Sequence, residues 1–145
     1  MDKKKVLVIE DDPAIAAALG RRLENLGYRV TRAGTAKRGM DLVDDADLVF
    51  LDMRLPDYSG EVWLERIRAA GNYIPVIAMS AVLSRDEAHD RLEKFKIVDF
   101  MEKPFTLQEV AEKAGRAAEL AEQMKFVGHA SLRLKGFIER QNGFH

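Results

Sequence analysis

The sequence predicts an α/β fold: a doubly wound, five-stranded parallel sheet with five helices, in three layers. Three observations support this prediction. Short apolar and β-branched runs recur along the chain, most clearly at residues 6–9, 48–51 and 74–79, as in strands that are covered on both faces. Segments with apolar residues at helical spacing follow such runs. The links are short, so each crossover returns the chain to the sheet in the right-handed sense, which places helices on both faces.

The first strand, at residues 6–9, is followed by a helix and a second strand-helix unit. Pro13 suits the first turn of a helix, and Gly27 follows its last apolar residue as a stop signal. Residues 28–33 predict a short strand. Thr35 can then cap a second helix that runs to about residue 43.

The middle of the chain contains the third strand-helix unit. The strand at residues 48–51 ends at Asp52, and the segment Leu55-Pro56-Asp57-Tyr58-Ser59-Gly60 has the composition of a tight loop. Apolar residues at helical spacing then mark the third helix: Val62, Trp63 and Ile67.

The same pattern occurs twice more. Residues 74–79 predict the fourth strand, and Ser84 with Glu87 forms a capping box for a helix to about Phe95. Residues 98–101 predict the fifth strand. Thr106 and Glu109 cap the last helix, whose apolar stripe comprises Leu107, Val110, Ala114, Ala117 and Met124.

Composition limits the possible classes of protein. The 145 residues suffice for one buried core, which we place at residues 1–125, with residues 126–145 as a C-terminal tail or the start of a linker. A net charge of −1 implies no nucleic-acid partner, and the absence of cysteine excludes a disulfide framework, a thiolate zinc site and a cysteine nucleophile. The apolar run at residues 6–9 is too short for a signal peptide or a membrane span, so we expect a cytoplasmic protein.

Chemically distinctive residues follow the predicted strands. Glu10-Asp11-Asp12 follows the first strand, Asp52 the third, and Lys103 the fifth, while Ser80 ends the fourth. Functional groups in open α/β sheets lie at the carboxyl ends of the strands. If the strand order is 2-1-3-4-5, then Glu10, Asp11 and Asp52 converge. Two carboxylates about 4 Å apart repel by roughly 4 kcal/mol at an effective dielectric constant near 20, so the group favours a cation such as Mg2+.

Each of these residues also has an ordinary structural interpretation. Asp12 precedes Pro13 and is best explained as a helix cap. A single aspartate at a strand end is usually a turn residue, a single lysine a surface residue, and a serine a strand-end hydroxyl. The occurrence of all of them on separate strand ends of one sheet is what indicates a site.

The ordered motifs of the chain resemble those of response regulator receiver domains over about residues 5–125. The segments that carry the resemblance are Val8-Ile9-Glu10-Asp11-Asp12, Leu51-Asp52-Met53-Arg54-Leu55-Pro56-Asp57-Tyr58-Ser59-Gly60, Met79-Ser80-Ala81 and Glu102-Lys103-Pro104-Phe105. The aspartate-to-glycine segment and the late Lys-Pro pair are specific only in combination.

This resemblance implies a phosphoacceptor role in a two-component phosphorelay. Asp52 would accept the phosphoryl group from a phosphohistidine of a sensor histidine kinase, and Ser80 and Lys103 would hold the phosphoryl oxygens. The implied Mg2+ ligands are Asp11, Asp52, Glu10 through water, and the backbone carbonyl of Arg54. Ser80 and Phe100 would form the switch, although Phe100 fits a plain core position equally well. Two positions depart from the family pattern, and both concern the switch rather than the acceptor site: Lys96-Ile97 precedes the fifth strand, and Phe stands in place of Tyr at position 100.

The resemblance also predicts the interactions of the chain. The expected partners are the kinase and either a downstream protein or an output domain missing from this chain, with no membrane contact and no catalysis beyond self-phosphorylation and dephosphorylation. A homodimer through the fourth helix, fifth strand and fifth helix is one option. The fourth helix has few apolar residues among eight charged residues at positions 85–96, so we expect it to move on phosphorylation.

Three other functions fit the sequence less well. A haloacid dehalogenase-like aspartyl phosphatase needs a second acid two residues after the first, where Arg54 stands. A flavodoxin-like nucleotide binder would repel phosphate with Glu10-Asp11-Asp12. A degenerate receiver that acts only in protein contacts does not require the complete set of acids, hydroxyl and lysine. In the tail, Leu132, Leu134, Phe137 and Ile138 could form a short amphipathic turn.

Overall fold

The computed structural model describes residues 3–127, whose five strands form one parallel sheet in the order β2-β1-β3-β4-β5. The strands are β1 (Lys5–Ile9), β2 (Arg29–Ala33), β3 (Leu48–Asp52), β4 (Val76–Ser80) and β5 (Asp99–Glu102). The helices are α1 (Pro13–Asn25), α2 (Ala36–Leu42), α3 (Gly60–Ala69), α4 (Arg85–Leu92) and α5 (Leu107–Val127), with short 3-10 turns at Val43–Asp45 and Glu93–Phe95. The predicted fold class and strand order are therefore confirmed.

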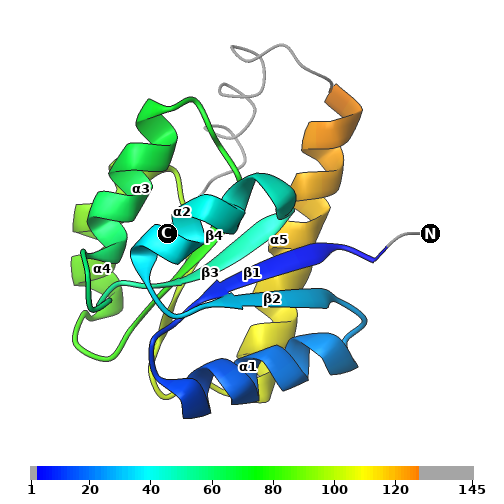
Figure 1. Cartoon of the computed structure of the whole chain (residues 1–145), viewed down its shortest axis with the longest axis horizontal. Helices are drawn as coiled ribbons and strands as arrows, with labels where there is room; N and C mark the ends of the chain where they lie inside the picture. The colour runs from blue at the N-terminus through cyan, green and yellow to red at the C-terminus, as the bar shows by residue number, and fades with distance from the viewer. Residues whose placement is uncertain (1–2, 128–145) are drawn as a thin grey trace.

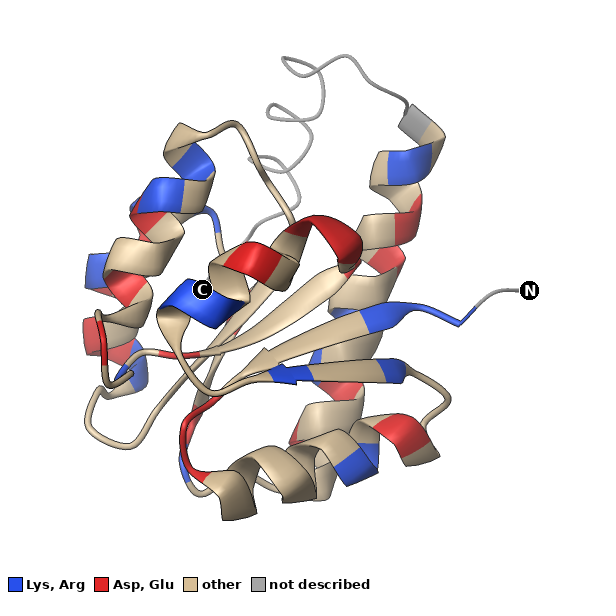
Figure 2. Ribbon diagram, viewed as in Figure 1, with Lys and Arg blue, Asp and Glu red and all other residues tan. Residues whose placement is uncertain are grey.

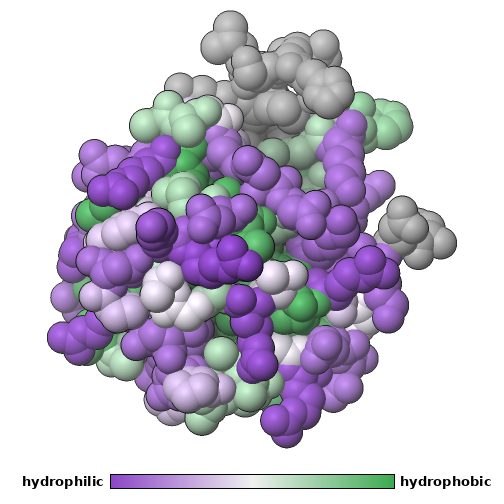
Figure 3. All heavy atoms as spheres, in the orientation of Figure 1, coloured by the Kyte–Doolittle hydropathy of each residue, from purple (hydrophilic) through white to green (hydrophobic). Residues whose placement is uncertain are grey.

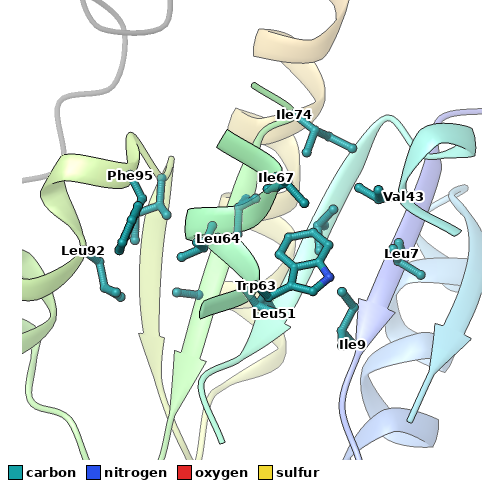
Figure 4. Close-up of a cluster of buried hydrophobic side chains, with 14 of the residues drawn as sticks. Leu7, Ile9, Val43, Leu51, Trp63, Leu64, Ile67, Ile74, Leu92 and Phe95 are labelled. Atoms are coloured by element: carbon teal, nitrogen blue, oxygen red, sulfur yellow. The ribbon is translucent and has the colours of Figure 1, made fainter. Parts of the chain in front are cut away.

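Helices cover both faces of the sheet (Figure 1). On one face, α2, α3 and α4 bury a cluster centred on Trp63, which Figure 4 shows beside Ile9 and Leu51. On the other, α1 and α5 cover a second cluster that includes Phe50 and Leu19. All residues of β3 and β4 are buried, which explains why these strands are continuous apolar runs rather than alternating ones.

The helix ends follow the predicted capping signals. The Thr35 hydroxyl accepts the backbone N–H of Arg38, and Ser84 and Glu87 form the predicted capping box. Gly27, just beyond α1, has a φ of +98°, a left-handed conformation that glycine adopts without steric cost.

Some predicted boundaries and contacts were wrong. The fourth strand begins at Val76 rather than at residue 74, because the amide of Ile74 bonds to the Asn72 side chain instead of to a strand. The predicted helix ends near residues 43 and 95 fall within the 3-10 turns Val43–Asp45 and Glu93–Phe95, which follow α2 and α4. Leu107, which was placed on the apolar stripe of the last helix, is 61% exposed at the first position of α5.

The last helix extends slightly past the predicted domain boundary. The helix α5 continues to Val127, two residues past the predicted domain boundary. The predicted amphipathic turn lies outside the described residues.

Figure 3 shows that the face in view is mainly hydrophilic. Within residues 3–127, no helix is both long and apolar enough to cross a membrane.

Candidate functional site

Three carboxylates meet at the carboxyl ends of β1 and β3. Because Ile9 is paired with Leu51 in the parallel register, the residues that follow them are brought to one edge of the sheet. Glu10, Asp11 and Asp52 each offer an oxygen within 4.8 Å of the others. Glu10 and Asp52 are buried and Asp11 is exposed. Figure 2 shows the acidic residues of the β1–α1 connection. The predicted convergence of these three residues is therefore present.

Lys103, which follows β5, supplies a cation to this group. Its Nζ lies 2.5 Å from Glu10 Oε1 and 3.3 Å from Asp52 Oδ2. Burial raises the pKa of Glu10 to about 7, and the neighbouring Asp52 adds to this, although Lys103 and the Asp12 amide act in the opposite direction. Burial would lower the pKa of Lys103, but Glu10 and Asp52 raise it above its usual value. When all three carboxylates of the cluster are ionised, this one ammonium group does not balance their charge.

The loop after β3 holds Asp52 in place. The amide of Arg54 donates to Asp52 Oδ1 at 3.2 Å, and Gly60 N donates to Met53 O. A Cβ atom on Gly60 would lie 2.5 Å from the Asp52 carbonyl oxygen and 2.9 Å from Met53 Cα. The first turn of α3 can approach the end of β3 this closely only because residue 60 is glycine.

Asp57 joins this loop to a different helix. Its two carboxylate oxygens accept the amides of Ala36 and Lys37, at 2.9 and 2.8 Å, in the first turn of α2. These bonds lower the pKa of Asp57, although desolvation acts against them. Sequence reasoning identified Asp57 only as a turn residue, because the pairing of this loop with α2 is not encoded locally.

Ser80 ends β4 and holds the start of the β4–α4 loop. Its Oγ accepts the amides of Val82 and Leu83 at 3.1 and 3.0 Å. The Ser80 side chain opens into a cleft of about 350 Å3, which also contains the acids and Lys103. The predicted site residues that line this cleft are Glu10, Asp11, Asp52, Arg54, Ser80 and Lys103.

Two further residues singled out from the sequence have structural roles. Asp12 caps α1, since its Oδ1 accepts the amides of Ala14 and Ile15, as predicted. Phe100 is 1% exposed and is packed in the cluster under α2, α3 and α4. It is paired with Ala78 of β4. The side chain is therefore a core residue in this conformation.

An apolar hollow of about 500 Å3 adjoins the cleft. It is bounded by the first turns of α1 and by the β5–α5 connection, where the Lys103–Pro104 peptide bond is cis. Its lining is Ala14, Ile15, Ala18, Ala81, Lys103, Pro104 and Phe105. Ile15, Ala81 and Lys103 line both cavities, so a molecule seated in the hollow would lie beside Asp52.

Comparisons with known proteins agree with this architecture. A family model described as the response regulator receiver domain matches residues 6–115. The chain is 37% identical over 109 residues to the uncharacterized transcriptional regulatory protein YrkP of Bacillus subtilis, covering 73% of this chain and 46% of that protein. It is 36% identical over 110 residues to the transcriptional regulatory protein PmrA of Pectobacterium parmentieri, covering 73% and 48%. The chain thus spans about half the length of these curated relatives.

Solved structures match over nearly their whole length. The receiver domain of a putative LuxO repressor protein from Vibrio parahaemolyticus superposes with a TM-score of 0.81 at 25% identity, covering 88% of this chain and 99% of that one. The non-phosphorylated HemR receiver domain of Leptospira biflexa gives a TM-score of 0.72 at 32% identity, covering 80% and 94%.

Proposed function

The chain belongs to the family of response regulator receiver domains, the phosphoacceptor modules of two-component signalling, and we propose that Asp52 is the residue that accepts the phosphoryl group. The observation that carries the proposal is the convergence of Glu10, Asp11 and Asp52 with Lys103 at one sheet edge. A buried aspartate at a strand end, within a polar cleft that is open to solvent, is accessible to a donor.

The donor groups of the cleft fit Mg2+. Hard oxygen ligands from one or two carboxylates, a backbone carbonyl and water are what this ion prefers. Asp11 and Asp52 would bind it directly, Glu10 through water, and Arg54 through its carbonyl oxygen. The bound ion would neutralise charge on the transferred phosphoryl group.

The chemistry of the chain itself is a displacement at phosphorus. An Asp52 carboxylate oxygen attacks the phosphorus of a phosphohistidine, the new O–P bond forms as the P–N bond breaks, and the histidine, which carries a proton on its other ring nitrogen, leaves as neutral imidazole. A carboxylate needs no general base to act as a nucleophile. Lys103 and the Ser80 hydroxyl then hold phosphoryl oxygens, so the residues of the cleft act by positioning and electrostatic stabilisation.

The apolar hollow fits a helix of a sensor histidine kinase as the donor. A histidine aimed at Asp52 has to approach over the shared wall of the cleft and the hollow, at Ile15 and Ala81. An apolar groove beside the reacting atom suits the apolar face of a helix. We place the chain in the cytoplasm, where such a kinase would present its phosphohistidine.

The output lies beyond the receiver unit. The relatives are named as transcriptional regulators and are about twice as long as the matched region. We therefore propose that residues 1–125 act on an output domain or a separate protein, with residues 126–145 as the tail or linker between them. The surface of α4, β5 and α5 is the proposed site of a homodimer.

Labelling by a small phosphodonor tests the acceptor. The native chain and Asp52→Asn are incubated with acetyl phosphate and Mg2+, and intact mass is measured over time. One phosphoryl group is expected on the native chain, none on the variant, and none on either when Mg2+ is removed. Asp57→Asn is the matched control, an aspartate in the adjoining loop that should still allow labelling. An unlabelled native chain, or equal labelling of native and Asp52→Asn, would overturn the proposal.

A further inference from the structure

Arg85, the first residue of α4, is tied to β5 by three hydrogen bonds. Its backbone amide donates to Glu102 Oε1 at 3.1 Å. Its guanidinium donates to the Phe100 carbonyl oxygen at 3.3 Å and to Asp99 Oδ1 at 2.9 Å. One residue therefore fixes the start of α4 to the first, second and last positions of a four-residue strand.

Asp99, which accepts from the Arg85 guanidinium, is itself buried and held by several hydrogen bonds. Its side chain is 5% exposed, and Oδ2 also accepts from Lys113 at 3.0 Å and Arg116 at 2.8 Å, both on α5. The amide of Phe100 donates to Oδ1. Burial favours the neutral acid, yet these donors lower the pKa of Asp99 below its usual value. Asp99 is therefore ionised at neutral pH.

The segment between β4 and α4 is held at both of its ends. At the first end, Ser80 Oγ accepts the amides of Val82 and Leu83. At the second end stands Arg85. If the Ser80 hydroxyl turns toward a phosphoryl oxygen, the two amides lose their acceptor and the loop must rearrange. The ties of Arg85 to β5 oppose that rearrangement.

We propose that Arg85 is a latch that holds the β4–α4 loop and the start of α4 in the unphosphorylated position, and so limits how readily the Asp52 site is phosphorylated. This inference rests on the proposed role of Asp52. Phosphorylation and loop movement are linked equilibria, so a change that weakens only the resting position increases the population of the other state. The guanidinium is a positioning group because it acts through the loop that carries the Ser80 contacts.

A pair of matched variants separates a specific effect of Arg85 on the β4–α4 loop from a general loss of stability around Asp99. Arg85→Met and Arg116→Met each remove one arginine from Asp99, at 2.9 and 2.8 Å, and the two side chains are 46% and 51% exposed. Of the two, only Arg85 adjoins the β4–α4 segment along the chain. With acetyl phosphate and Mg2+, Arg85→Met is expected to label ~3- to 10-fold faster than the native chain, as expected for loss of charge-assisted bonds at a half-exposed side chain. Arg116→Met is expected to label at the native rate.

Hydrogen exchange provides a readout that does not depend on phosphorylation. The amides of Val82 and Leu83 should exchange faster in Arg85→Met, whereas amides in the middle of β3 should not change. In Arg116→Met the loop amides should exchange as in the native chain.

The outcomes distinguish this inference from the acceptor assignment. If the native chain is labelled and Arg85→Met is labelled at the same rate, the latch is overturned but the role of Asp52 is not. The same holds if Arg116→Met matches Arg85→Met in labelling rate and in hydrogen exchange. Failure of the native chain to label overturns the role of Asp52, and with it any control of phosphorylation by Arg85. Faster exchange confined to the loop amides of Arg85→Met, together with faster labelling, supports the latch.

Discussion

The Asp99→Asn substitution tests the buried charge cluster that joins α4, β5 and α5. It keeps the shape of the side chain and removes its charge. In the native chain, Asp99 accepts from Arg85, Lys113 and Arg116. An asparagine offers one oxygen to these cations and turns an N–H2 group toward them, so both attraction and hydrogen bonds are lost.

The expected loss of stability follows from the exposure of the partners. Lys113 is 15% exposed, and a charge-assisted bond in such a setting contributes roughly 1.5 to 3 kcal/mol. The two arginines are about half exposed, so each contributes roughly 0.5 to 1 kcal/mol after screening by solvent. The total cost of Asp99→Asn is therefore about 2.5 to 5 kcal/mol, close to what is typical of a broken buried ion pair.

The effect should depend on pH in a defined direction. The pKa of Asp99 is lowered in the folded chain, so its contribution is fully present above the pKa of the unfolded chain, near 3.9. It is lost as the pH falls through the lower folded pKa. The difference in unfolding free energy between native and variant should be constant between about pH 5 and pH 8, and should shrink below about pH 4.

Urea unfolding measures both quantities, with the fluorescence of Trp63, the single tryptophan of the chain, as the probe. Asp41→Asn serves as the control, because Asp41 is an exposed aspartate with one arginine 4.0 Å away. It should change stability by less than about 0.5 kcal/mol. A loss for Asp99→Asn of under about 1 kcal/mol at neutral pH, or a loss as large at pH 3.5 as at pH 7, would refute the reasoning.

Three further substitutions follow from the contacts of the site and its supports. Gly60→Ala should lower the unfolding free energy by about 1 to 3 kcal/mol, because the added Cβ meets backbone atoms of Asp52 and Met53. The control is Gly20→Ala, which should not destabilise the chain, because its added Cβ meets only side chains at 3.6 Å or more. Equal thermal stabilities of the two variants would contradict this prediction. Arg68→Met should cost about 2 to 4 kcal/mol in urea unfolding, since the guanidinium donates to four backbone carbonyls; a loss below about 1 kcal/mol would count against it. Mg2+ at ten times its dissociation constant should raise the unfolding free energy of the native chain by about 1.4 kcal/mol. This gain should vanish in Asp11→Asn. Equal gains in the native chain and the variant would exclude Asp11 as a ligand.

The fold was predictable because its signals are local. Strands buried on both faces leave continuous apolar runs, and helix starts are marked by residues such as Thr35 and Ser84 whose side chains bond to amides three residues away. Boundaries were less predictable. The start of β4 depends on the Asn72 side chain capturing an amide, and the hydrophobic pattern carries no sign of this.

The acidic cluster was predictable from topology, since the carboxyl ends of parallel strands meet at one edge. The contacts that hold the surrounding loops in place were not predictable in the same way. Asp57 reaches the first turn of α2, and Arg85 reaches β5, across distances of 14 to 21 residues in sequence. The one local signal was available at Asp99, an acid inside the otherwise apolar segment Ile97-Val98-Asp99-Phe100-Met101. A buried charge within a strand indicates that cations from other elements must converge on it.

The charges of the cleft explain why a signal formed at Asp52 would leave through the β4–α4 loop. When the three carboxylates are all ionised they face one ammonium group, so two negative charges remain, and one divalent cation would balance them. Phosphorylation of Asp52 replaces a single negative charge by a group carrying about two, which again leaves the cleft negative. One donor in the cleft that can turn toward this charge is the Ser80 hydroxyl, whose oxygen accepts the amides of Val82 and Leu83. If this hydroxyl turns away from the two amides to donate to the phosphoryl group, stabilising the phosphoryl group competes with holding the loop, and the hydrogen bonds of Arg85 to β5 oppose the loop movement.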